Sequence, residues 1–322
     1  MGQENMDFPS SEQMKKIITE LKVVQWPEYD GNDLPMFLKN IETKFFSKLK
    51  FMSSFYLKAL ENFSSEFKFF RARPVAEIKN IDLFCEYSYP IPTLVKRNNR
   101  ANFIKHPVFY ASDEPLVALV EFIQEWKESK DHVGKEFAIS KWKINKPGEF
   151  LLRPFLSSSI IGHNEYAILA DQSNEEMRAC LGPTITDDQL EGVRLYKDFI
   201  AEMYITDKYR CISPYFAYQS LYNNHTDHHC IFMYPSTKVK FKGANFALHP
   251  NFVDENMSLE YIYKIIINDI SEYEDGINFN YSISNDFGMN VNGKIKWEPI
   301  ELIVDKFKNL YQKDWGQSNK EN

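Results

Sequence analysis

Apolar residues in the first part of the chain recur at the spacing of amphipathic helices. They lie on one helix face over residues 11–24, and a second stripe over residues 34–60 includes Leu34, Leu38 and Phe45. We therefore expect two helices, over 11–24 and 34–60. Together they predict an N-terminal helical region, residues 1–64.

Beyond residue 65 the pattern changes to short apolar runs mixed with further helical segments. Strands are expected at 67–76, 106–112, 136–142, 149–153, 230–236 and 245–250, and a hairpin at 277–284 and 289–297. Helices are expected at about 113–126, 186–204, 214–222, 257–272 and 299–312. Because strands and helices do not alternate regularly, the order favours an α+β fold over a doubly wound sheet.

Two of these helices carry start signals. Asp113 suits a cap and Pro115 tolerates the first helical turn. Thr186 is followed three residues later by Gln189, which is a capping-box spacing.

Composition narrows the functional classes. The 322 residues include 26 Phe, 18 Tyr and 5 Trp, a content that disordered chains lack. The net charge of −7 argues against a general nucleic-acid binder, which needs a basic excess. Only 12 glycines are present, about half the usual share, so a glycine-rich phosphate loop is not expected.

The cysteines and the apolar stretches bear on the compartment. Cys85, Cys180, Cys211 and Cys230 form no CxxC motif, which favours a reducing cytosol over a framework of two disulfides. The N-terminus has neither the basic nor the apolar region of a secretory signal. The longest apolar stretches, such as 115–120, are too short to cross a membrane. We expect a cytoplasmic protein with no membrane and no nucleic-acid partner.

Two short motifs invite functional interpretations. Residues 288–295 match the Gly-x-x-x-x-Gly-Lys part of a P-loop, but Ile295 replaces the hydroxyl residue that would hold Mg²⁺. Asn292-Gly293 between strand-like runs instead predicts a hairpin turn. The cluster His225, Asp227, His228, His229 and Cys230 lies within six residues, whereas zinc ligands usually come from two separated pairs, so we expect a polar loop and no metal site.

Four separated segments resemble, in order and spacing, the RES domain family, which is named for its Arg, Glu and Ser residues. They are Phe70–Pro74, Asn99–Asn102 with 107–112, Ala118–Glu121, and Tyr234–Ser236 with Gly243–Asn245. Ten residues separate Arg100 from Tyr110 and eleven separate Tyr110 from Glu121, intervals like those of the family. The resemblance covers about residues 65–255.

The resemblance implies an enzyme that degrades NAD⁺ by cleaving its nicotinamide–ribose bond, through phosphorolysis or hydrolysis. Many such proteins are bacterial toxins, which makes an antitoxin or immunity protein an expected partner. The implied fold is α+β, with a catalytic core over 65–255 similar to ADP-ribosyltransferase toxins. Residues 1–64 would add helices, and 256–322 a helix–hairpin–helix extension packed on the core. NAD⁺ is the substrate, inorganic phosphate the other candidate reactant, and no cofactor is implied.

The resemblance also implies roles for individual residues. Arg71 would bind a phosphate of NAD⁺ or the attacking phosphate, and Arg100 would share that anion. Tyr110 would line the nicotinamide side. Glu121 would hold the reacting ribose and stabilise positive charge at its anomeric carbon, while Ser236 would hydrogen-bond the substrate near the bond that breaks.

Asn245 is a further candidate for substrate binding, and Arg73 is an alternative to Arg71. The residue types suit the chemistry, because a carboxylate stabilises an oxocarbenium-like transition state. Arginine forks match phosphate oxygens, and an aromatic face suits a cationic ring.

Each residue taken singly also has a structural interpretation. Arg71 and Arg73 would suit a surface strand edge, Tyr110 the core and Ser236 a turn, while helical periodicity places Glu121 away from the apolar stripe. Two other functions stay open: an ADP-ribosyltransferase that modifies a macromolecule, and a catalytically silent nucleotide-binding module. Asn99 stands where the family has glycine, which motivates the second of these.

Overall fold

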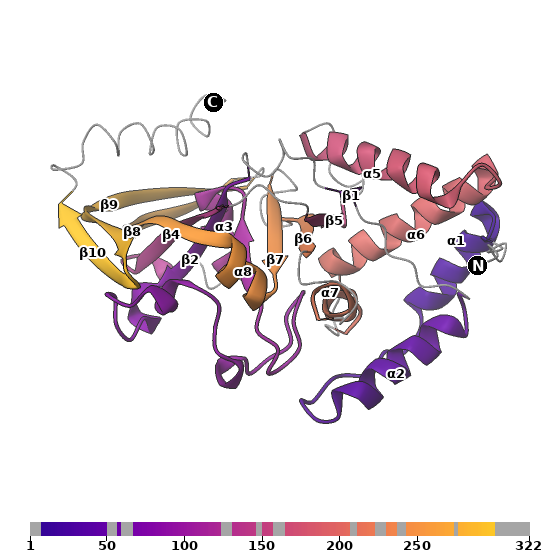
Figure 1. Cartoon of the computed structure of the whole chain (residues 1–322), viewed down its shortest axis with the longest axis horizontal. Coiled ribbons are helices and arrows are strands. Elements are labelled where there is room, and N and C mark those ends of the chain that lie inside the picture. The colour runs from indigo at the N-terminus through magenta and orange to yellow at the C-terminus, as the bar shows by residue number, and fades with distance from the viewer. Residues whose placement is uncertain are drawn as a thin grey trace. The chain divides into compact units, whose positions relative to one another are not determined.

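The fold comes from a computed structural model of the chain (Figure 1). It describes residues 8–49, 57–58, 67–123, 131–145, 150–156, 165–206, 211–222, 230–236, 243–273 and 276–299. Helices and strands are mixed along the chain, consistent with the expected α+β class.

The chain divides into two compact units, each described by itself. The first unit comprises Met1–Ala59, Ile91–Val108 and Glu149–Pro235. The second unit comprises Leu60–Pro90, Phe109–Gly148 and Ser236–Asn322. Both units are assembled from separated segments, so many of their contacts join residues far apart in the sequence.

Helices make up most of the first unit. They are α1 (Ser11–Lys22), α2 (Leu34–Phe46), α5 (Glu165–Leu181), α6 (Asp187–Thr206) and α7 (Ile212–Leu221). The expected helix at 11–24 is confirmed as α1, and Ser10 and Gln13 form a reciprocal capping box at its start. None of the helices in the described ranges is long and apolar enough to cross a membrane.

The expected helix at 34–60 is wrong in its last part. It ends at Phe46 as α2, and Leu57–Lys58 form the short strand β1 instead. Strand β1 pairs antiparallel with β5 (Leu151–Pro154), which pairs parallel with β6 (Cys230–Pro235). Pairing with these distant strands, which local periodicity does not reveal, decides the conformation of residues 57–58.

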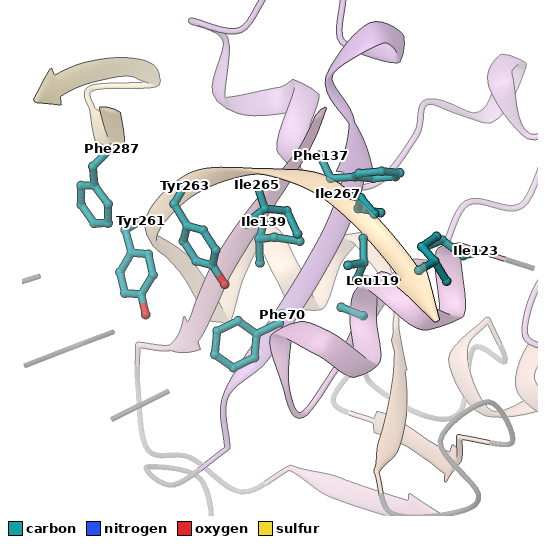
Figure 2. Close-up of a cluster of buried hydrophobic side chains, with 12 residues drawn as sticks. Phe70, Leu119, Ile123, Phe137, Ile139, Tyr261, Tyr263, Ile265, Ile267 and Phe287 are labelled. Carbon is teal, nitrogen blue, oxygen red and sulfur yellow. The ribbon is translucent and has the colours of Figure 1, made fainter. Parts of the chain in front are cut away.

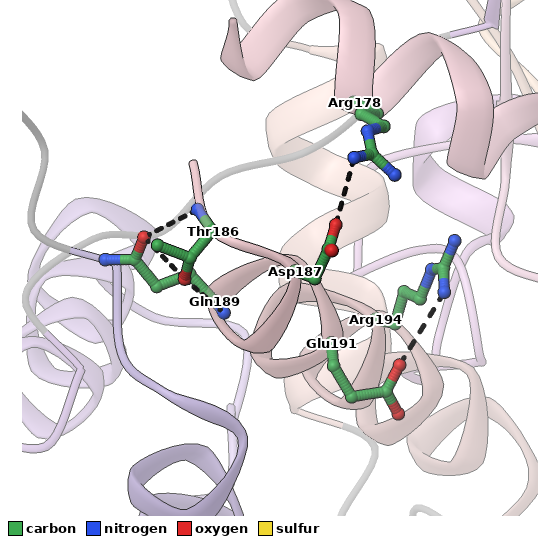
Figure 3. Close-up of polar contacts among 6 residues, drawn as sticks. All are labelled: Arg178, Thr186, Asp187, Gln189, Glu191 and Arg194. Carbon is green, nitrogen blue, oxygen red and sulfur yellow. Dashed lines mark hydrogen bonds and ion pairs between the residues drawn. The ribbon is translucent and has the colours of Figure 1, made fainter. Parts of the chain in front are cut away.

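The start of α6 follows the sequence signal closely (Figure 3). The Thr186 main-chain N–H donates to Gln189 Oε1 at 3.0 Å, and the Gln189 N–H donates to Thr186 Oγ1 at 3.2 Å. Arg178 in the last turn of α5 donates to Asp187 in the first turn of α6 at 2.9 Å. The acidic side chain at a helix N-terminus is also favourable for the helix dipole.

An antiparallel sheet forms most of the second unit. Its strands follow the order β7-β3-β2-β4-β8-β9-β10. Their bounds are β2 (Phe69–Pro74), β3 (Phe109–Ser112), β4 (Glu136–Ile144), β7 (Ala244–Leu248), β8 (Met257–Tyr273), β9 (Gly276–Val291) and β10 (Lys294–Pro299). Two short helices accompany the sheet, α3 (Pro115–Phe122) and α8 (Pro250–Asn256).

Strand β2 has two different neighbours. It pairs with β4 along its whole length, from Phe69↔Trp142 to Pro74↔Phe137. Its pairing with β3 is a single residue pair, Phe70↔Ser112. Beyond that pair β3 continues alongside β7, so β2 and β3 separate after residue 70.

Helix α3 packs on one face of this sheet through an apolar cluster (Figure 2). Leu119 and Ile123 contribute from the helix region and Phe70 from β2. Ile139 of β4 and Ile265 of β8 belong to the same cluster. Because Phe287 of β9 also belongs to it, the cluster connects α3 to strands β2, β4, β8 and β9.

The expected helix at 257–272 is wrong, because these residues form β8. Buried positions 261, 263, 265 and 267 belong to the same cluster, an alternation with the period of a strand. The segment is rich in Ile and Tyr, which favour strands, and β8 pairs with β4 on one side and β9 on the other.

The turn at Asn292–Gly293 is confirmed. Both residues have positive φ, 53° and 81°, and connect β9 to β10 as a hairpin. Residues 288–295 are therefore strand, turn and strand, which excludes the strand–loop–helix arrangement of a P-loop. Residues 277–284 belong to the single long strand β9, and residues 300–312 of the last expected helix lie outside the described residues.

Close packing of α6 on the N-terminal segment generates a stability prediction. A Cβ at Gly192 would stand 3.1 Å from the Ser10 carbonyl oxygen and closer still to that of Pro9. We expect Gly192→Ala to lower the free energy of unfolding by about 1–3 kcal/mol in denaturant titrations, because main-chain atoms must move. The exposed neighbour substitution Glu191→Ala should change it by less than about 0.5 kcal/mol. Equal effects of both would contradict the packing.

Candidate functional site

Arg71 lies where β2 and β3 separate. Its Nη1 donates to the main-chain carbonyl of Tyr110 at 3.2 Å, and its guanidinium carbon is 5.8 Å from the centroid of the Phe109 ring. Its Nε is buried and has no hydrogen-bond partner among the described residues. Arg71 thus keeps donor capacity for an additional acceptor.

The two arginines of β2 differ in their partners. Arg73 donates to the Glu86 carboxylate at 2.9 Å and also to the carbonyls of Glu77 and Glu86. Within the described ranges no carboxylate is within ion-pair distance of Arg71. Burial, followed by the charge of Arg73, lowers the pKa of Arg71 to about 10. Arg71 is still protonated at neutral pH, so it is the better candidate of the two for binding an anion.

Glu121 and Ser236 are in direct contact. Ser236 Oγ donates to Glu121 Oε1 at 2.6 Å across a sequence separation of 115 residues. Ser236 is fully buried, and Glu121 is half-buried in the last turn of α3. Although helical periodicity places Glu121 away from the apolar stripe, its carboxylate accepts a hydrogen bond from a buried hydroxyl.

Asn245 lies on β7 opposite Ser112 of β3. The two are register partners, and Ser112 Oγ donates to Asn245 Oδ1 at 2.7 Å. The Asn245 side-chain amide nitrogen is buried and makes no hydrogen bond within the described part of the chain. The sequence did not identify Ser112 as the partner of Asn245, because the local pattern of residues does not reveal the register between β3 and β7.

The pleat of β3 separates the candidates into two groups. Phe70 and Ser112 are register partners, so their side chains share the face on which α3 packs. Alternation places Tyr110 on that face and Arg71 on the other, where Phe109 lies. Arg71 therefore contacts the main chain of Tyr110, while the Tyr110 side chain shares its face with Ser112 and Asn245.

Arg100 belongs to the first unit, in a loop held together by asparagine side chains. The Asn99 side chain donates to Asn102 Oδ1 at 3.1 Å, and the Asn98 side chain donates to the Tyr29 carbonyl at 2.8 Å. Arg100 is half-buried in this loop.

The histidine-rich segment lies outside the described residues, apart from Cys230. Within the described ranges, no group of three or more His, Cys, Asp or Glu side chains is arranged to hold a metal ion. Burial raises the pKa of the Cys230 thiol to about 11, so this cysteine is protonated at neutral pH and poorly nucleophilic.

The Ser112–Asn245 bond generates a prediction with a matched control. Ser112→Ala should lower the free energy of unfolding by about 1–3 kcal/mol, because the buried Asn245 oxygen loses its donor. Ser282 donates to Asn268 at 3.3 Å in an exposed pair of the same type, so Ser282→Ala should have little effect. Thermal or denaturant unfolding measures both, and a larger loss for Ser282→Ala would refute the assignment.

In comparisons with known proteins, no family model matches the chain and no curated protein matches it. The resemblance to the RES family therefore rests on the residues quoted from the sequence, and it stays a prediction.

Proposed function

We propose that the chain is an NAD⁺-degrading enzyme that cleaves the nicotinamide–ribose bond, with phosphate or water as the nucleophile. The observation that carries the proposal is the Ser236–Glu121 hydrogen bond. Two residues predicted to be catalytic, from segments 115 residues apart, are in contact, and the serine is fully buried. Buried polar side chains in proteins are generally hydrogen-bonded, and Ser236 meets this requirement through Glu121.

The carboxylate of Glu121 suits the proposed transition state. Departure of nicotinamide leaves positive charge on the ribose, and an oriented carboxylate stabilises an oxocarbenium-like species. The hydrogen bond from Ser236 to Oε1 restricts rotation of this carboxylate. A fixed orientation lowers the reorganisation needed when the charge develops.

Arg71 and Asn245 are the proposed donors for the rest of the substrate, Asn245 from the face on which α3 packs and Arg71 from the other face, at the point where β2 and β3 separate. The buried Arg71 guanidinium has donor capacity left at Nε, and phosphate oxygens are strong acceptors for such a group. The buried amide nitrogen of Asn245 is a second donor. Tyr110 supplies the aromatic ring for nicotinamide in this proposal, from the face that it shares with Asn245.

The central test is incubation of the folded protein with NAD⁺, with and without inorganic phosphate. We expect nicotinamide release, and chromatography distinguishes ADP-ribose from its phosphorylated product. Glu121→Gln should lower the rate by about 100-fold or more while the melting temperature stays close to that of the wild type. Absence of nicotinamide release under both conditions refutes the proposal, and transfer of label to a macromolecule favours an ADP-ribosyltransferase.

The contrast between the two arginines gives a second test. Arg71→Met removes a half-buried cation that has no carboxylate partner in the described residues, so stability should be equal or greater. The KM for NAD⁺ should rise by about tenfold or more, because a charge-assisted hydrogen bond to phosphate is lost.

Arg73→Met is the matched control. It should lower stability by about 1–3 kcal/mol, because Glu86 loses its partner, and should change KM little. The reverse result, with KM raised only by Arg73→Met, would assign the anion to Arg73.

A further inference from the structure

Asp113 makes two hydrogen bonds to the main chain of Ala244, the residue that follows Gly243. Its main-chain N–H donates to the Ala244 carbonyl at 3.1 Å, and its Oδ2 accepts the Ala244 N–H at 3.1 Å. The sequence signal predicted that Asp113 caps α3, but that expectation is wrong. The N-cap is Glu114, which makes no side-chain capping bond, and the Asp113 carboxylate is directed to β7 instead.

A short chain of contacts leads from this pair of bonds to Glu121. The Ser236 main-chain N–H donates to the Gly243 carbonyl at 2.9 Å, and Ser236 Oγ donates to Glu121 at 2.6 Å. Gly243 lies directly against α3, since a Cβ there would stand 2.7 Å from Val117 Cγ2. Asp113, just before α3, therefore holds residues 243–244 through its hydrogen bonds to Ala244. Glu121, in the last turn of the same helix, accepts a hydrogen bond from Ser236, whose main chain is bonded to Gly243.

We propose that Asp113 is a positioning residue, which sets the position of Ser236 through Ala244 and Gly243 and thereby orients the Glu121 carboxylate. This inference rests on the proposed function for its effect on rate. Asp113 needs only an acceptor oxygen for this role, because its partner is a main-chain N–H. A displacement of about 1 Å in such a support can lower a rate by about 100-fold without changing ground-state binding.

The experiment compares Asp113→Ala with Asp113→Asn. Asp113→Ala should lower kcat for NAD⁺ cleavage by about 10- to 100-fold and leave KM within about twofold. Asp113→Asn keeps an acceptor oxygen and should retain kcat within about threefold. NMR-detected hydrogen exchange should show faster exchange of the Ser236 and Ala244 amides in Asp113→Ala only.

Asp286→Asn is the control in the same unit. Asp286 accepts a hydrogen bond from Lys264 at 2.7 Å on β8, away from α3, so its loss should lower stability without changing kcat. Should Asp113→Ala fail to fold, Gly243→Ala replaces it, since the added Cβ would stand 2.7 Å from Val117 Cγ2 and 3.2 Å from Asp113 Oδ1 and would displace residue 243. It should lower kcat in the same way.

Two results would overturn the inference. An equal loss of kcat in Asp113→Asn and Asp113→Ala would mean that the charge of Asp113 acts, not its acceptor geometry. Unchanged exchange of the Ser236 and Ala244 amides in Asp113→Ala would mean that the support does not exist. If the wild-type protein releases no nicotinamide, the proposed function fails, and the exchange measurement still decides whether Asp113 holds Ser236.

Discussion

The apolar contact of α3 with the sheet of the second unit determines where the candidate catalytic residues lie. Helix α3 has only two turns, which is too short for a stable helix on its own, so burial of Leu119 against Phe70 holds it in place. Once the helix is fixed, Glu121 in its last turn and Asp113 just before its first turn are fixed too. Ser236 then meets Glu121 because residues 243–244 are tied to Asp113.

Strand β2 imposes a second constraint, on the position of Arg71, because its pairing differs on its two sides. It is fully paired with β4 but shares only Phe70↔Ser112 with β3, so the side chain of Arg71 lies where two strands part. Arg71 is half-buried and has no carboxylate partner among the described residues, and burial lowers its pKa from the usual value. Arg73, two residues later, differs from Arg71 because it forms an ion pair with Glu86.

Local signals predicted local structure well and long-range pairing poorly. The capping box at Ser10, the Thr186–Gln189 start of α6 and the Asn292–Gly293 turn were all readable, because each depends on residues within a few positions. Residues 257–272 were predicted to be a helix, although apolar residues alternate with the period of a strand from Met257 to Ile267. Strand β8 is decided by β4 and β9, which flank it on both sides. The same limit explains why Asp113 was expected to cap a helix when its acceptor role is toward Ala244.

The sequence by itself determined the mixed helix-and-strand composition, the helix starts, the hairpin turn and a set of candidate residues in a family-like order. Only the tertiary structure decided which of them meet. It joined Glu121 to Ser236, gave Asn245 the partner Ser112, and engaged Arg73 with Glu86 while leaving Arg71 with buried donor capacity. The physical reason is that strand register and helix packing set these contacts. Both depend on burying apolar side chains from distant segments together, which no local pattern encodes.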